Sequence, residues 1–171
     1  FYGACFIPNK MCMVTEFAEY GNLDDLMKNN PDNILPLKMR IKLLLDASKG
    51  IEYLHTNGIM HRDIKPENVV IDQNGRIVLI DFNASRKVSV ASKDTVIMGT
   101  VGYASPEQLG VCGTDARTDI YAVGVLLNVM VTGKHPSERL ARGKAGYIVR
   151  KCTNVNPNDR YQTTERLSKA L

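Results

Sequence analysis

HRDIKPEN, at residues 61–68, places a carboxylate, an ammonium group and a side-chain amide close together in the sequence. An apolar pair precedes it, so Asp63 should emerge from a rigid base. The carboxylate of Asp63 can orient or deprotonate a hydroxyl group, and Lys65 can offset charge on a moving phosphoryl group. The amide oxygen of Asn68 is a suitable Mg²⁺ ligand. The stretch therefore indicates phosphoryl transfer.

A second carboxylate, Asp81, ends the sequence VLID at residues 78–81 and is the candidate main metal ligand. Each of these residues alone has a simpler explanation, because a single Asp in a loop is usually a turn former. Turn chemistry does not account for the whole set in this order. We therefore predict that Asn68 and Asp81 bind magnesium beside Asp63.

The rest of the sequence predicts a mostly helical body with a few small hairpins, an α+β fold. Strands are expected at residues 10–17, 69–71 and 76–80. The turn sequence DQNG at residues 72–75 joins the last two strands as a hairpin. Helices are expected at residues 23–28, from 37 to 54 or 55, at 119–132, around 145–152 and from 163 to the end. Residues 86–98 are predicted to form a mobile loop, and residues 106–109 one helical turn.

Two glycines mark helix ends. Asn57-Gly58 is typical of a left-handed C-terminal cap, and Gly133 is expected to end the helix at residues 119–132. That helix is apolar on almost every side, which predicts a central buried position. Its longest apolar stretch, residues 120–131, contains Asn128 and is too short to span a bilayer.

Length and composition are those of an ordinary globular domain. The chain has 171 residues, enough for one compact domain, and a net charge of only +4. One concentration of basic residues is too sparse for nucleic-acid binding and is interpreted as a solvated face: Arg139, Arg142, Lys144, Arg150 and Lys151. The cysteines are far apart and form no CxxC pair, which favours reduced thiols in the cytoplasm over a zinc site or a disulfide framework. They are Cys5, Cys12, Cys112 and Cys152.

The sequence resembles the protein kinase family over almost its whole length. HRDIKPEN is similar to the family's catalytic loop, and Lys65 in it is typical of the serine/threonine branch. DFN at residues 81–83 stands where the family has DFG, and GTVGYASPE at 99–107 resembles the substrate-binding loop that closes with APE. DIYAVG from Asp119 resembles the start of the central helix, and RY from Arg160 the late arginine of the family. The stretches DFNASR, GYASPEQ and NPNDRYQT are most similar to bacterial kinases.

The resemblance implies a protein-kinase-like fold and one fragment of a kinase domain. Residues 1–17 would be the last strands of the N-terminal lobe with the start of the hinge, and 18–171 the C-terminal lobe. The implied activity is transfer of the γ-phosphate of MgATP to Ser or Thr hydroxyls of a protein substrate. Most of the N-terminal lobe, which normally covers the phosphates, is missing from this sequence. We therefore expect a piece of a longer protein that binds ATP weakly and turns over little by itself.

The resemblance also assigns individual residues. Asp63 would be the catalytic base, Lys65 would contact the γ-phosphate, and Thr100 would align Asp63 with the substrate hydroxyl. Asn68 and Asp81 would hold the magnesium ions and contact the nucleotide. The remaining ATP-binding residues would be the gatekeeper Thr15, the hinge residues Glu16, Phe17 and Ala18, the adenine floor Val70, and Glu67 of the catalytic loop.

Arg62, directly before the catalytic Asp, is a feature of kinases that are switched by phosphorylation of the activation loop. A phosphate there would supply negative charge to the guanidinium group. The candidate acceptors are Ser89, Ser92 and Thr95, and the alternative is that they are ordinary polar loop residues.

Three further residues are expected to be structural. Asp119 should accept backbone N–H groups of the catalytic loop and fix its shape. Glu107 and Arg160 should form a buried ion pair that ties the substrate loop to the last helices. The histidines are not expected to be ligands: His61 should pack inside, whereas His55 and His135 should lie at the surface.

Two positions depart from the family pattern within the matched region. Asn83 replaces a glycine, and Asn tolerates the left-handed conformation that the glycine permits. Asp81 is therefore still expected to reach the metal. Ser105 in place of the Ala of APE is expected to be harmless.

Two other functions stay open from the sequence. A pseudokinase, acting as a regulatory or binding module, usually lacks the catalytic Asp, the Asn or the metal-binding Asp, and this sequence has all three. A small-molecule kinase of related fold would not need the peptide-substrate loop GTVGYASPE, and Lys65 also argues against it.

Overall fold

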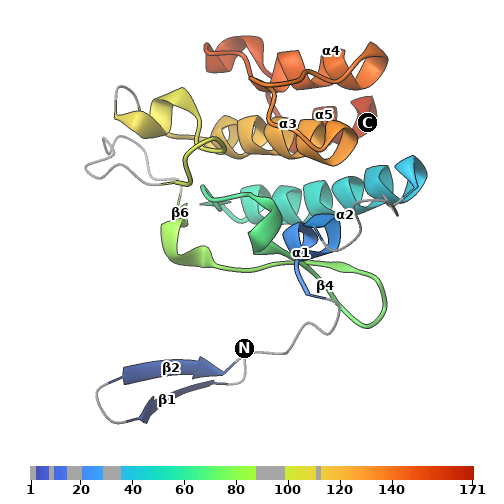
Figure 1. Ribbon diagram of the computed structural model, residues 1–171. Coiled ribbons are helices and arrows are strands. Elements are labelled where there is room, and N and C mark those ends of the chain that lie inside the picture. Colours follow the sequence, from blue (N-terminus) through green and yellow to red (C-terminus); the bar gives the residue numbers. More distant parts are fainter. Residues whose placement is uncertain (1–2, 8–9, 15–20, 29–35, 88–98, 111–112) are drawn as a thin grey trace.

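The computed structural model describes residues 3–7, 10–14, 21–28, 36–87, 99–110 and 113–171. Its helices are stacked, with α4 (Gly143–Cys152) on α3 (Ala116–Thr132), and α3 on α2 (Leu37–Thr56) (Figure 1). The short helix α5 (Thr164–Ala170) packs against α2, and α1 (Leu23–Lys28) lies beside the catalytic loop. The predicted helices are therefore confirmed, and the fold is α+β with a mainly helical body.

Short antiparallel strand pairs accompany these helices. The strand β1 (Gly3–Ile7) pairs with β2 (Lys10–Val14), and β4 (Val69–Ile71) pairs with β5 (Ile77–Leu79) through the predicted turn. A third pair, β3 (Ile59–Met60) with β6 (Arg86–Lys87), corrects one prediction, because residues 86–87 were expected in a loop. Residues 15–17 of the predicted first strand and 88–98 of the predicted loop lie outside the described residues.

Two of the cysteines, which are separated in the sequence, lie on paired strands. Cys5 and Cys12 are directly opposite each other in the register of β1 and β2. Cys152 is a free cysteine, buried where α4 meets α3, and burial raises the pKa of its thiol to about 12. A thiol that stays neutral at physiological pH is a packing group rather than a nucleophile.

The helix α3 is the centre of the core. It starts before the predicted residue 119, because the side chain of Asp115 accepts the backbone N–H of Arg117 at 2.8 Å and caps the helix. Gly133, with φ of 70°, ends it as predicted. Leu126 of α3 is fully buried in one cluster with Ile51 of α2 and Leu167 of α5. Full burial of such a side chain stabilises the fold by about 1.5–3 kcal/mol.

Helices α3 and α4 approach each other closely at Gly124. A Cβ atom at this position would lie 2.3 Å from the Cβ atom of Cys152. The small residue is therefore required by packing, since atoms cannot come so close without a shift of one helix.

Asn128, the one polar break in the apolar stretch, is fully buried and organises the segment after α3. Its Nδ2 atom donates to the carbonyl oxygens of Lys134 and Arg139, both at 2.8 Å. Its Oδ1 atom accepts the backbone N–H of Ala141 at 2.8 Å. One buried side chain thus forms hydrogen bonds with three backbone groups of the segment after α3.

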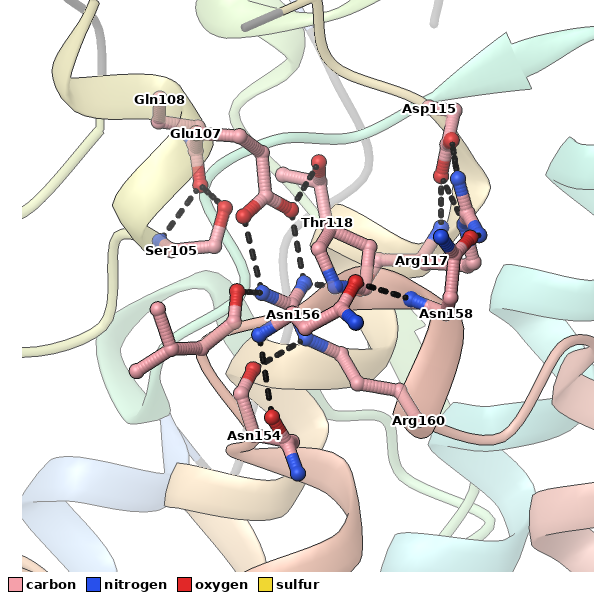
Figure 2. Close-up of polar contacts among 12 residues, drawn as sticks. Ser105, Glu107, Gln108, Asp115, Arg117, Thr118, Asn154, Asn156, Asn158 and Arg160 are labelled. Carbon is pink, nitrogen blue, oxygen red and sulfur yellow. Dashed lines mark hydrogen bonds and ion pairs between the residues drawn. The ribbon is translucent and has the colours of Figure 1, made fainter. Parts of the chain in front are cut away.

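The buried ion pair between Glu107 and Arg160 is confirmed. Arg160 donates from both terminal nitrogens, at 2.7 and 2.8 Å, to the two carboxylate oxygens of Glu107 (Figure 2). Burial works to raise the pKa of Glu107, but the Arg160 guanidinium outweighs it, and the pKa lies below its ordinary value. The same guanidinium also donates to the carbonyl oxygens of Asn154 and Val155, so it joins the substrate loop to the segment before α5.

No helix in the described ranges is both long enough and apolar enough to cross a bilayer.

We predict that Gly124→Ala lowers the free energy of unfolding by about 1–3 kcal/mol, because the added methyl group overpacks the α3–α4 contact. Gly113→Ala is the control, since its Cβ position meets only open space. Chemical denaturation of both variants measures the effect. Equal stability of Gly124→Ala and the unmodified chain would contradict the close approach.

Arg160→Met should lower the free energy of unfolding at neutral pH by about 3–5 kcal/mol, because it leaves Glu107 buried without its cation. Arg166→Met, at an exposed position of α5, is the control. The lowered pKa of Glu107 contributes stability above its ordinary value of 4.5, and that stability is lost as the pH falls through the folded-state pKa. The difference between the variant and the unmodified chain should therefore shrink in acid, and a difference that grows there would contradict this account.

Candidate active site

The catalytic loop, residues 61–68, lies between β3 and β4 in the sequence and is hydrogen-bonded to Asp119 of α3. The fully buried carboxylate accepts the backbone N–H of His61 at 2.9 Å and that of Arg62 at 2.7 Å. Arg62 takes a left-handed conformation with φ of 67°, which turns the chain sharply before Asp63. The predicted structural role of Asp119 is confirmed.

His55 corrects the sequence prediction of a surface residue. Its side chain is only 11% exposed, and its Nε2 atom lies 2.8 Å from Oδ2 of Asp119. Its Nδ1 atom lies 2.9 Å from the hydroxyl group of Thr164. The histidine therefore links the end of α2 to α3 and α5, and it orients the carboxylate that holds the catalytic loop. His135 is half-buried and lies 2.9 Å from the carbonyl oxygen of Gly102 in the substrate loop.

Four of the predicted site residues form one hydrogen-bonded cluster. Oδ1 of Asp63 accepts the hydroxyl group of Thr100 at 2.7 Å and its backbone N–H at 3.1 Å. The ammonium group of Lys65 lies 3.2 Å from Oδ2 of Asp63 and donates to the Thr100 hydroxyl at 2.8 Å. Nδ2 of Asn68 donates to Oδ2 of Asp63 at 3.0 Å and to its carbonyl oxygen at 2.9 Å.

This cluster sets the charge and direction of the Asp63 carboxylate. Burial works to raise its pKa, but hydrogen bonds from Thr100, Lys65 and Asn68 outweigh burial and lower the pKa below its ordinary value. The group is therefore ionised at neutral pH and is suited to orient a hydroxyl group. Both hydrogen bonds of Asn68 use its amide nitrogen, which leaves the amide oxygen as the atom suited to a metal ion.

His61 connects this loop to Asp81. Nε2 of His61 donates to the carbonyl oxygen of Ile80 at 3.0 Å, since a carbonyl oxygen can only accept, and the backbone N–H of Asp63 donates to Nδ1 at 3.4 Å. The ring packs against Phe82 with centroids 4.8 Å apart. The backbone N–H of Ile80 also donates to the carbonyl oxygen of Asn68, which brings the segment that carries Asp81 beside the catalytic loop.

The expected left-handed conformation at Asn83 is wrong. Asn83 lies in the short 3₁₀ helix Phe82–Ala84, and the left-handed residue is Asp81, with φ of 63°. The carboxylate of Asp81 is exposed, and its Oδ1 atom accepts the backbone N–H of Asn83 at 3.3 Å. The left-handed residue therefore lies two residues earlier in the chain than expected, and Asp also tolerates this conformation.

Two other predicted site residues, Val70 and Glu67, are among the described residues. Val70 is 8% exposed, and its strand forms an isolated bridge with Asn22. Glu67 is exposed. Burial first, and then the negative charges of Glu67 and Asp24, raise the pKa of Tyr103 in the segment 99–107 to about 12. The hinge and gatekeeper residues, Thr15 to Ala18, and the candidate phosphate acceptors Ser89, Ser92 and Thr95 lie outside the described residues.

Gln108 is a buried residue of this region that sequence reasoning missed. Its Oε1 atom accepts the backbone N–H of Ser105 at 3.0 Å (Figure 2). The hydroxyl group of Ser105 also donates to that oxygen, at 3.2 Å. Its Nε2 atom donates to the carbonyl oxygen of Arg62 at 2.8 Å. The substitution of Ala by Ser in the APE position thus fits the local structure.

Comparison with known proteins shows the family to which the chain is similar. The family model described as "Protein kinase domain" matches residues 1–171. A probable serine/threonine-protein kinase of Dictyostelium discoideum is 28% identical over 186 residues, which cover 99% of this chain and 18% of the relative. The serine/threonine-protein kinase STY17 of Arabidopsis thaliana is 30% identical and is matched over 100% of this chain and 30% of its own length. A probable serine/threonine-protein kinase of Clostridium perfringens is 29% identical over 91% of this chain and 26% of its own length.

These matches define both the family and the extent of the similarity. The relatives come from an amoeba, a plant and a bacterium, so a particular similarity to bacterial kinases is not confirmed. The chain spans less than a third of the length of each relative. It belongs to the protein kinase family, and the relatives reported above are named serine/threonine-protein kinases.

Proposed function

We propose that the full-length protein transfers the γ-phosphate of ATP to Ser or Thr hydroxyls of proteins, with Asp63 as the catalytic base. The observation that carries this proposal is the ionised carboxylate of Asp63, aimed by hydrogen bonds from Thr100, Lys65 and Asn68. A carboxylate held in this way can fix the direction of attack by a hydroxyl group and accept its proton. Lys65 then supplies positive charge next to the group that is transferred.

The family uses ATP and Mg²⁺, and the residues of this chain fit both. The carboxylate of Asp81 and the amide oxygen of Asn68 are hard oxygen ligands, and Mg²⁺ is often bound by one or two carboxylates together with phosphate oxygens. A bound magnesium ion would neutralise charge on the phosphates. Val70 would contact the adenine ring from β4, Glu67 would contribute from the catalytic loop, and residues 15–18 would supply the gatekeeper and the hinge.

The proposal extends to the setting of the enzyme. The boundary at residue 17 divides the end of the N-terminal lobe from the C-terminal lobe, and the missing part of that lobe would cover the nucleotide. The chain alone should therefore have weak activity, and the full-length protein should be active. The proposal also includes a cytoplasmic location, a protein substrate, and regulation by phosphorylation of Ser89, Ser92 or Thr95.

Asp63→Asn in the full-length protein should reduce kcat for phosphorylation of a Ser/Thr protein substrate by about 10²–10⁴-fold, because the amide cannot accept the proton. Asp46→Asn is the control, since that residue lies at the surface of α2 with only an exposed contact to Lys49. Transfer of radiolabelled phosphate from MgATP measures both. If the unmodified full-length protein shows no transfer at all, a regulatory pseudokinase replaces the proposal.

Thr100 offers a pH test of the same cluster. Its hydroxyl group lowers the pKa of Asp63, so Thr100→Val should raise that pKa toward its ordinary value. Since the ionised form is the active one, the acid limb of the rate profile should move to higher pH in Thr100→Val. Thr100→Ser keeps the hydroxyl group and should leave the limb in place. Identical profiles for the valine and serine variants would show that the hydrogen bond does not tune Asp63.

A further inference from the structure

A pocket of about 410 Å³ lies on the part of the molecule formed by α1, the start of α2, the end of α3 and the segment after α3. Its described lining residues are separate from the catalytic cluster, and its volume is within the range of sites that bind ligands. We call it the α1–α3 pocket, and its described lining consists of Leu23, Leu26, Met27, Arg40, Val129 to Gly133 and Arg139 to Arg142.

The floor of the α1–α3 pocket is apolar. Leu23 and Met27 come from α1, Val129 from α3 and Leu140 from the following segment. Leu37, one turn before Arg40 on α2, is a further apolar side chain and is 55% exposed.

The polar part of the lining is basic. Arg40 donates to the carbonyl oxygens of Met130 and Val131, which places its guanidinium group on the pocket wall. Arg139 and Arg142 are exposed, and neither forms an ion pair with any residue in the described part of the chain. The described lining contains no Asp or Glu. An apolar cavity beside Arg139 and Arg142, which have no ion-pair partner among the described residues, favours an occupant that is apolar and negatively charged.

Hydrogen bonds to a buried side chain also fix one wall of the pocket without a ligand. Asn128 holds the carbonyl group of Arg139 and the N–H group of Ala141, both at 2.8 Å, from inside the core. The segment that carries the two exposed arginines is therefore fixed by a buried side chain. Such preorganisation reduces the conformational entropy that binding would cost.

We propose that the α1–α3 pocket is a docking site for a peptide segment of a partner protein in which a large apolar side chain is flanked by acidic residues. The apolar side chain enters the cavity, and the carboxylates lie at Arg139 and Arg142. The segment binds away from Asp63, so the partner can be held while the catalytic cluster stays open. This inference does not depend on the proposed transfer activity.

The test uses the 171-residue chain and a short fluorescein-labelled peptide with Leu side chains flanked by Glu. Fluorescence anisotropy should show saturable binding with Kd below about 1 mM. Matched peptides with Lys in place of Glu, or Ser in place of Leu, should bind at least about tenfold more weakly. No binding of the Leu/Glu peptide would overturn the proposal.

Reversing the charge of the two exposed arginines tests whether the peptide binds at the α1–α3 pocket. The double variant Arg139→Glu/Arg142→Glu should weaken the Leu/Glu peptide by about tenfold or more and should gain affinity for the Leu/Lys peptide. Arg150→Glu/Arg166→Glu is the control, because it changes the net charge equally at exposed positions outside the pocket lining. Circular dichroism checks that both variants are folded. Equal weakening by the two double variants would overturn the proposal, and so would binding of decanoate, an apolar carboxylate without a peptide backbone, in place of the peptide.

Discussion

The buried carboxylate of Asp119 is the constraint on which the active site depends. It accepts the N–H groups of His61 and Arg62, and His55 contacts it from α2. A buried charge with too few hydrogen-bond donors would be strongly destabilising, so the three partners stabilise both the ion and the loop geometry. Because Asp119 is part of the rigid central helix, the position of the catalytic loop is tied directly to the core.

The catalytic loop that Asp119 holds contacts two other segments of the site. His61 reaches Ile80 and Phe82, which brings Asp81 beside the loop. Asp63 reaches Thr100 of the substrate loop, and that loop is in turn held by Gln108 and by the ion pair of Glu107 with Arg160. Each contact joins segments that are far apart in the sequence, so displacement of one segment changes the direction of the Asp63 carboxylate.

Much of this could be predicted from sequence because the candidate site residues fall in short, ordered motifs. The cluster of Asp63, Lys65, Asn68 and Thr100, the role of Asp119 and the pair of Glu107 with Arg160 are all present in the structure. His55 was misplaced because a polar residue at a helix end resembles a surface residue until its partners on α3 and α5 are known. Gln108 and Asn128 hold backbone groups through long-range contacts that no local pattern reveals. The left-handed residue was assigned to Asn83 instead of Asp81, since both types tolerate that conformation.

Amide hydrogen exchange in Asp119→Asn tests the central claim most directly. The N–H groups of His61 and Arg62 donate to different oxygens of Asp119, and the substitution replaces one of these oxygens with an NH2 group that cannot accept a hydrogen bond. Exchange at His61 and Arg62 should accelerate by about 10–100-fold relative to the amides of Leu126 and Leu127 in α3, as expected for the loss of hydrogen bonds to a charged group. Unchanged protection of His61 and Arg62 would show that Asp119 does not hold the catalytic loop.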